Sequence, residues 1–286
     1  MPRVTPTETG SCTRRFLDLQ TSAVQVAWDT PTLHYRSTVA RDCFFQIVVV
    51  ISLVLAHVFA TFLAPVHGCP TGYLGPGGLH DGARHFNCTG GAAGFIDRRL
   101  FGDHMYTHPT SQKVYDSSVP YDPEGVLGSL TSIFLVYLGI VAGKTILIYP
   151  DPKQRIIRWA VWAVTLGLAA GALCGFAKEG GIIPVNKNLW SLSYVLTSGS
   201  FAFSLFLLLY LLIDVCDVWS GSPFFYAGMN SIVLYVGHEL CEGYFPLDWV
   251  PFTPGHAELL LMNTWATMCW MLVSFGLYKS NFFLSV

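Results

Sequence analysis

Charged residues are scarce in this sequence, and those present are scattered. Asp, Glu, Lys and Arg make up 12% of the 286 residues, and the formal net charge is −2. No run of basic residues offers a face for a polyanion, so we expect no nucleic-acid partner. Hydrophobic residues make up 52% of the chain and the mean hydropathy is +0.47, outside the range of soluble globular domains. The composition predicts an integral membrane protein.

The motifs of many soluble enzymes are missing as well. The sequence contains no P-loop, no GxGxxG and no GxSxG, which removes the usual signs of nucleotide-binding and hydrolase sites. His104 and His108 are four residues apart, like the ligands of a helical zinc site, but Pro109 follows directly and there is no HExxH pattern. We therefore expect no metal. No internal repeat of the kind found in many transporters is visible either.

Six apolar segments are each long enough to cross about 30 Å of hydrocarbon, which takes roughly 20 helical residues. They cover residues 43–64, 126–149, 156–177, 191–213, 223–245 and 257–278. The sequence therefore predicts an all-α fold, a polytopic bundle of about six transmembrane helices within residues 43–286. The polar residues 1–42 show no clear periodicity and no motif, and we expect them to be a disordered cytosolic lead-in.

One long polar loop, residues 66–124, separates the first two predicted spans. It contains Asn87-Cys88-Thr89, a tripeptide that accepts an N-glycan only in the secretory lumen, although such tripeptides also occur unmodified by chance. Cys69 and Cys88 flank the same glycine-rich stretch, where an oxidising lumen would bridge them to each other or to another chain. We therefore place the loop in the lumen, and an even number of spans then places both termini in the cytosol.

Basic residues near the span ends agree with this topology, because they gather on the predicted cytosolic face: Arg36, Arg41, Lys144, Lys153, Arg155, Arg158 and Lys279. Lys187 is an exception, since it lies in a short luminal connection. It suggests a carboxylate partner, with Asp122 or Glu124 nearest by depth, or an anionic ligand. A solvated surface lysine is the simpler alternative.

Several polar side chains lie in or beside the predicted spans, where they are costly and are candidates for function. Asn230 and His238 lie in the fifth span, with His238 in the luminal third; a histidine bonded within the bundle is the alternative. Hydroxyl groups share one face of the fourth span, either bonding to carbonyls or lining a polar path: Ser193, Thr197, Ser200 and Ser204. Small residues along the second and third spans predict close helix packing, and a homo-oligomer is possible.

Five stretches in order resemble the heparan-alpha-glucosaminide N-acetyltransferase family, over its C-terminal half and from about residue 62 onward. They read GCPTGYLGPGGLHD, NCTGGAAGFIDRRLFGDHMYTHP, YDPEGVLGSLTSI, GIIPVNKNLWSLSYV and PFFYAGMNSIVLYVGHE. The resemblance implies a multi-pass enzyme of the lysosomal membrane. Such an enzyme takes acetyl-CoA from the cytosol and acetylates the terminal glucosamine of heparan sulfate in the lumen.

The resemblance also implies roles for particular residues. The luminal motifs imply an acceptor-side shell, although helix capping alone also explains YDPEG: Asp97, His104, Asp122, Glu124, Asn186, Lys187, Asn188, Trp190, Asn230 and His238. Four cytosolic residues are candidates for the phosphates of coenzyme A, although the topology alone would require them: Lys144, Lys153, Arg155 and Arg158.

The histidine that the family uses for acetyl transfer has no counterpart here, so the catalytic residue is unknown. We expect the chain to be the C-terminal half of such an enzyme and to be inactive alone. A small-solute transporter and a non-catalytic membrane partner are the alternative functions.

Overall fold

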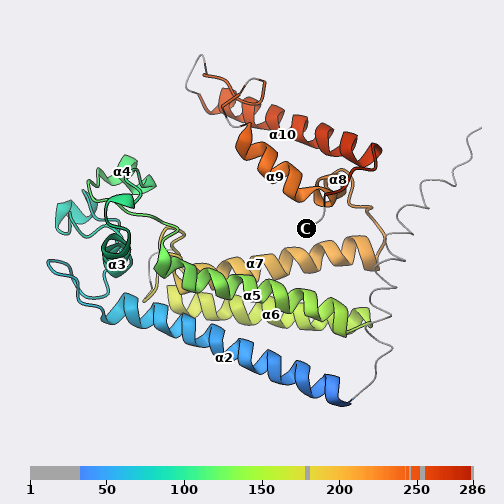
Figure 1. The fold of residues 1–286 in the computed structure, drawn as a ribbon, viewed down its shortest axis with the longest axis horizontal. Helices are drawn as coiled ribbons and strands as arrows, with labels where there is room; N and C mark the ends of the chain where they lie inside the picture. Colours follow the sequence, from blue (N-terminus) through green and yellow to red (C-terminus); the bar gives the residue numbers. More distant parts are fainter. Residues whose placement is uncertain (1–32, 178–180, 242, 245, 252–254, 285–286) are drawn as a thin grey trace, which may run out of the picture. The chain divides into compact units, whose positions relative to one another are not determined.

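The computed structural model describes residues 33–177, 181–241, 243–244, 246–251 and 255–284. Within these ranges the chain is helical and contains no strand, so the predicted all-α class is confirmed (Figure 1). The chain divides into two compact units, Met1–Leu207 and Leu208–Val286, and each is described by itself.

The first unit contains three long helices and most of a fourth: α2 (Leu33–Leu63), α5 (Val126–Ile148), α6 (Pro152–Cys174) and α7 (Leu192–Tyr210). Helix α5 packs against α2 and against α6 (Figure 1). Helices α6 and α7 meet where Ser200 Oγ donates to the Ala163 carbonyl at 2.7 Å. A Cβ atom at Gly167 would lie 2.8 Å from the same hydroxyl, so the small residue is needed for this approach.

Five helices in the described residues are long and apolar enough to cross a membrane: Phe44–Leu63, Val126–Ile148, Pro152–Cys174, Leu192–Val215 and His256–Lys279. All five begin and end within a few residues of predicted spans, because long apolar runs determine their positions. The helix that contains the first span, α2, is longer than that span, since it begins at Leu33. The residues 33–42 are therefore helical rather than disordered, and residues 1–32 lie outside the described ranges.

The fifth predicted span, residues 223–245, is not one long helix. It contains α8 (Phe224–Met229) and α9 (Ser231–Leu240), separated by Asn230 with φ −131° and ψ 38°. The Asn230 side chain is fully buried; its Nδ2 donates to Phe282 O at 3.0 Å and its Oδ1 accepts from Leu284 N at 3.1 Å. An asparagine that binds another segment in this way favours a helix break. The sixth membrane crossing, and with it the cytosolic C-terminus, stays a prediction.

The second unit packs α8 and α9 against α10 (His256–Lys279). Aromatic rings make the contact: Tyr226 meets Phe275 and Tyr278 at centroid distances of 5.2 and 4.9 Å. Helices α9 and α10 approach closely at Gly237, where a Cβ atom would lie 2.7 Å from the Trp270 ring. Rings and one glycine therefore determine how these helices pack.

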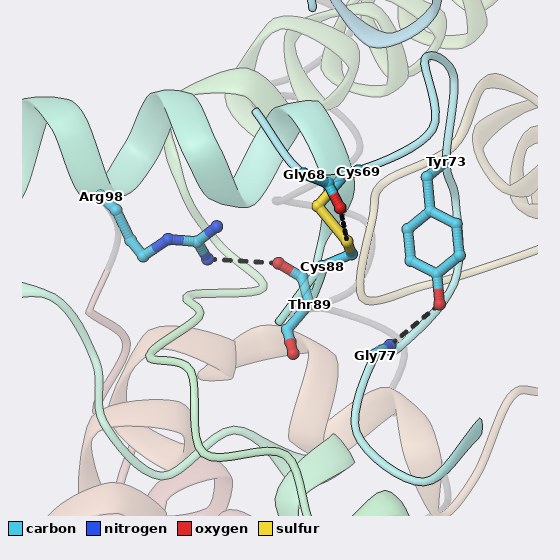
Figure 2. The surroundings of a disulfide bond; sticks show 7 residues. All are labelled: Gly68, Cys69, Tyr73, Gly77, Cys88, Thr89 and Arg98. Carbon is cyan, nitrogen blue, oxygen red and sulfur yellow. Dashed lines mark hydrogen bonds between the residues drawn. A yellow bond between two sulfur atoms is a disulfide. The ribbon is translucent and has the colours of Figure 1, made fainter. Parts of the chain in front are cut away.

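The 66–124 loop is folded rather than extended. It contains α3 (Gly91–Phe101), α4 (Thr110–Tyr115) and two 3₁₀ turns, η1 (His80–Ala83) and η2 (Gly102–His104). Helix α3 packs against α2 and α5. Cys69 and Cys88, the two cysteines that the sequence singled out, form a disulfide (Figure 2). The bridge closes the glycine-rich stretch ahead of α3.

Candidate functional site

Asp97 lies at the centre of the contact between the 66–124 loop and the bundle. Its side chain is 1% exposed, and Oδ1 accepts from Val126 N at 3.0 Å, with a further bond from the Leu127 backbone. Helix α5 has no side-chain cap of its own, so a carboxylate from α3 caps it. Burial raises the pKa of Asp97, against the lowering effect of these two backbone bonds. The Asp97 carboxylate therefore serves to cap the first turn of α5.

Arg98 and Tyr121 join the other parts of this junction. Arg98 Nη1 donates to the Thr89 carbonyl at 3.2 Å and to the Pro120 carbonyl at 3.0 Å. The Tyr121 hydroxyl donates to the Asn188 carbonyl, and burial raises the pKa of Tyr121, with the nearby Asp97 charge adding to the shift. The 66–124 loop is thereby bonded to the segment that precedes α7.

That segment, residues 184–191, folds into a compact turn. Asn186 Oδ1 accepts from Asn188 N at 2.9 Å, and Ser191 Oγ donates to the Pro184 carbonyl at 2.8 Å. Trp190 has a φ of +46°, and its Cδ1 would lie 3.0 Å from a Cβ atom at Gly128. Its ring packs on α5 and meets Tyr194 edge to face at 5.7 Å, so a part in the acceptor-side shell competes with this packing.

The remaining acceptor-side candidates of the first unit are accessible to solvent. His104 and Glu124 are exposed, and the partly exposed Asp122 accepts from Glu124 N through Oδ1 at 2.9 Å. Lys187 is exposed and, among the described residues, has no ion-pair partner. The carboxylate partner suggested for Lys187 is therefore not formed, which leaves an anionic ligand or solvent.

The other two acceptor-side candidates belong to the second unit. Asn230 uses its amide to hold the C-terminal segment, as described above. His238 is exposed, and its Nδ1 lies 3.9 Å from the neighbouring Glu239 carboxylate. The role of His238 in an acceptor-side shell stays a prediction.

A small cavity lies under the junction of the first unit and offers about 10 Å³, room for about one water molecule. It is lined by residues of α2, of the 66–124 loop and of the segment before α7, among them His57, Thr61, Ala93, Leu189 and Ser191. Thr61 Oγ1 is buried and, within the described ranges, has no hydrogen-bond partner. A bound water would satisfy it.

His57 is a buried polar residue of this cavity that the sequence reasoning missed. Its side chain is 4% exposed, and Nδ1 lies 2.8 Å from the Leu127 carbonyl. Because a carbonyl only accepts, Nδ1 carries the hydrogen, which leaves Nε2 of the neutral ring as an acceptor. A lone histidine within the apolar first span was the signal that could have found it.

Three of the four basic candidates for coenzyme A already contact other residues of the protein. Lys144 Nζ donates to Gln46 Oε1 at 2.9 Å, Arg155 Nη2 donates to the Ile146 carbonyl at 3.0 Å, and the Arg158 guanidinium lies 3.7 Å from the Tyr149 ring centroid. Lys153 is exposed. The Lys144 contact joins α5 to α2, and the two arginine contacts stabilise the turn between α5 and α6. A role in binding coenzyme A stays a prediction.

Comparison with known proteins identifies the relatives of this chain. No family model matches it. Over 226 residues it is 53% identical to heparan-alpha-glucosaminide N-acetyltransferase of Homo sapiens and 51% identical to that of Mus musculus. The chain is homologous to heparan-alpha-glucosaminide N-acetyltransferase. The match covers 78% of the chain and 34% of each relative, so the chain spans about one third of their length rather than the expected half.

Within the described part of the chain, no three His, Cys, Asp or Glu side chains gather in a way that could hold a metal ion. The junction instead combines backbone groups, hydroxyls and a buried carboxylate. Such groups can orient a polar ligand through hydrogen bonds.

Proposed function

We propose that this chain forms the acceptor side of a lysosomal membrane acetyltransferase. The donor would be acetyl-CoA on the cytosolic side, and the acceptor a terminal glucosamine of heparan sulfate in the lumen. The observation that carries the proposal is the 53% identity over 226 residues to an enzyme named for this acetylation. Identity at this level over several spans supports a shared fold and a shared ligand surface.

The reaction requires a neutral amine, a group that takes its proton, and donors for the developing oxyanion. The amine nitrogen forms a bond to the acetyl carbon while the carbon–sulfur bond of the thioester breaks and the coenzyme A thiolate leaves. The leaving thiolate, or a base near it, then takes up the proton of the amine. Any protein residue in these roles must be reachable by both substrates.

The structure separates the candidates into two groups. Asp97 and Trp190 hold the junction together and would act by positioning other residues. His104, Glu124 and Lys187 are exposed and are available to a glycan. In the proposal, Lys187 binds a sulfate or carboxylate of the glycan, since its ammonium group has no protein partner within the described residues.

The experiment uses membranes of cells that lack the endogenous activity. They receive acetyl-CoA labelled in the acetyl group on the cytosolic side and a glucosamine glycoside on the luminal side. The chain is expressed alone, and also together with the remaining two thirds of the human relative as a separate polypeptide.

We expect labelled N-acetylglucosaminide from the combination and none from either part alone. Acetylation by the chain alone would support the proposed reaction. It would contradict the expectation that the transfer histidine lies outside this chain. Transport of the glycoside without acetylation, or no product while both parts are in the membrane, would overturn the proposal.

A further inference from the structure

The tripeptide Asn87-Cys88-Thr89 is divided by the fold into one accessible residue and two inaccessible ones. The Asn87 side chain is exposed, whereas Cys88 and Thr89 are 3% and 1% exposed. Figure 2 shows Cys88 bonded to Cys69, with Thr89 beside Gly77 and Arg98. In the folded loop, the Asn87 amide that accepts a glycan is therefore exposed. The two residues that complete the tripeptide, Cys88 and Thr89, are buried.

The Thr89 hydroxyl cannot be reached in the folded loop. Gly77 lies directly against Thr89, since a Cβ atom on Gly77 would be 2.6 Å from Thr89 Oγ1 and 2.8 Å from Thr89 N. Thr89 Oγ1 is buried and, in the described part of the chain, forms no hydrogen bond. The glycan-accepting tripeptide requires Ser or Thr at its third position, so the transferase must contact this hydroxyl.

The backbone on both sides of Asn87 is also fixed. Gly78 N donates to Phe86 O at 2.9 Å, and Cys88 N donates to His85 O at 3.0 Å. On the other side, the Thr89 carbonyl accepts from Arg98 Nη1 at 3.2 Å. Pulling this segment into the active site of another enzyme would break these bonds and would be opposed by the disulfide to Cys69.

We propose that Asn87 accepts its glycan only before the Cys69–Cys88 disulfide closes, so that glycosylation and oxidation of the 66–124 loop compete. In the first reaction, Asn87 Nδ2 bonds to the anomeric carbon of a lipid-linked oligosaccharide. The bond from that carbon to the pyrophosphate breaks, the lipid pyrophosphate leaves, and the amide loses one proton. In the second reaction, the two thiols lose two protons and two electrons to a disulfide oxidant of the lumen.

Glycosylated and unglycosylated chains can reach the same folded structure of the 66–124 loop. Because Asn87 is exposed, a glycan attached to it extends into solvent without displacing Cys88 or Thr89. Glycosylated and unmodified chains can therefore both close the disulfide afterwards. The proposal is independent of the acetyl-transfer function, and it requires only that the loop reach the lumen.

The test measures the glycosylated fraction of newly synthesised full chain in cells, by a glycosidase-sensitive shift in mobility. Cys69→Ser leaves the tripeptide unchanged but prevents the disulfide. Cys216→Ser removes an exposed free cysteine outside the loop and is the matched control. Asn87→Gln and Thr89→Val each remove one part of the acceptor signal.

We expect a larger glycosylated fraction for Cys69→Ser than for the wild type and for Cys216→Ser, and none for Asn87→Gln or Thr89→Val. A reducing agent present during synthesis should raise the wild type to the level of Cys69→Ser. Purified, oxidised, unglycosylated chain should accept no glycan from added transferase and lipid-linked donor until it is reduced.

Three results would overturn the proposal. The first is glycosylation of the oxidised, folded chain by added transferase. The second is an equal glycosylated fraction in the wild type and Cys69→Ser. The third is no glycan on any variant. None of them bears on acetyl transfer, so failure here is distinguishable from failure of the proposed enzyme.

Discussion

Asp97 in the first unit and Asn230 in the second are two fully buried polar side chains that each bind the backbone of a distant segment. Asp97 only accepts, from Val126 N at the start of α5. Asn230 both donates and accepts, from its position between α8 and α9 to the C-terminal segment at Phe282 and Leu284. The sequence singled out both as ligand-binding candidates, but their partners show that both organise backbone. Asp97 needs only an acceptor atom, whereas Asn230 needs both a donor and an acceptor. We therefore expect Asp97→Asn to be tolerated and Asn230→Asp to be destabilising.

The largest effect is expected for Asn230→Asp. The change places a carboxylate oxygen against the Phe282 carbonyl, where an amide N–H now donates, and a buried unpaired charge costs about 3–5 kcal/mol of unfolding free energy. The measurement is denaturant unfolding of the purified chain in detergent. Asn186→Asp is the matched control, because Asn186 Oδ1 accepts from Asn188 N and Asp retains that acceptor. Equal effects of the two changes would contradict the role assigned to Asn230.

A smaller loss is expected for Asp97→Ala. It removes the cap of α5 and leaves buried N–H groups without a partner, at a cost of roughly 1–3 kcal/mol. Asp97→Asn should retain most of the stability, since an amide oxygen still accepts from Val126 N. Unfolding in detergent compares the two, with the exposed Asp103→Ala as control. If Asp97→Asn destabilised the chain as much as Asp97→Ala, the charge rather than the acceptor atom would be the important feature.

The pH dependence of Asp97 should be smaller still, with a defined sign. Burial raises the folded-state pKa of Asp97 above its ordinary 3.8, so the folded state holds this proton more tightly than the unfolded state. The contribution of Asp97 to stability is therefore greatest at acidic pH, and it decreases as the pH rises from 3.8 through the raised folded-state pKa. The stability difference between the wild type and Asp97→Asn, measured across that window, should shift against the wild type as pH rises. A difference independent of pH would contradict the effect of burial.

The smallest effect is expected for Thr89→Val. The Thr89 hydroxyl is buried and, among the described residues, makes no hydrogen bond, so a methyl group in its place should change stability by about 0.5 kcal/mol or less. Heat unfolding of the unglycosylated chain checks this. Thr131→Val is the matched control. Thr131 Oγ1 donates to the Trp190 carbonyl at 2.8 Å, so removing this hydroxyl should lower the stability of the chain. A large loss for Thr89→Val would mean that its hydroxyl has a partner.

The long helices were predictable because a single property, about 20 consecutive apolar residues, determines them. Helices α5, α6, α7 and α10 lie within a few residues of the predicted spans for this reason. The break at Asn230 was not predictable, since its cause is a bond to residues 52 and 54 positions further along the chain. Local sequence contains no sign of such a partner.

Some residues of the junction were predictable from the sequence, but its contacts were not. The family resemblance named Asp97, Asn188 and Trp190, and the structure connects their segments. The connections, however, use backbone atoms: Val126 N, the Asn188 carbonyl and the Trp190 carbonyl. Every residue carries such atoms, so no side-chain pattern reveals which of them will be bonded.

The short turn between α5 and α6 has a mechanical consequence. Arg155, on α6, donates to the Ile146 and Tyr149 carbonyls at the end of α5, and Arg158 lies over the Tyr149 ring. Arg155 and Arg158, one helical turn apart on α6, thus both contact the end of α5. Sliding one helix past the other would break all these contacts together. We therefore expect this end of the pair to behave as a fixed pivot, which resists sliding of α5 along α6.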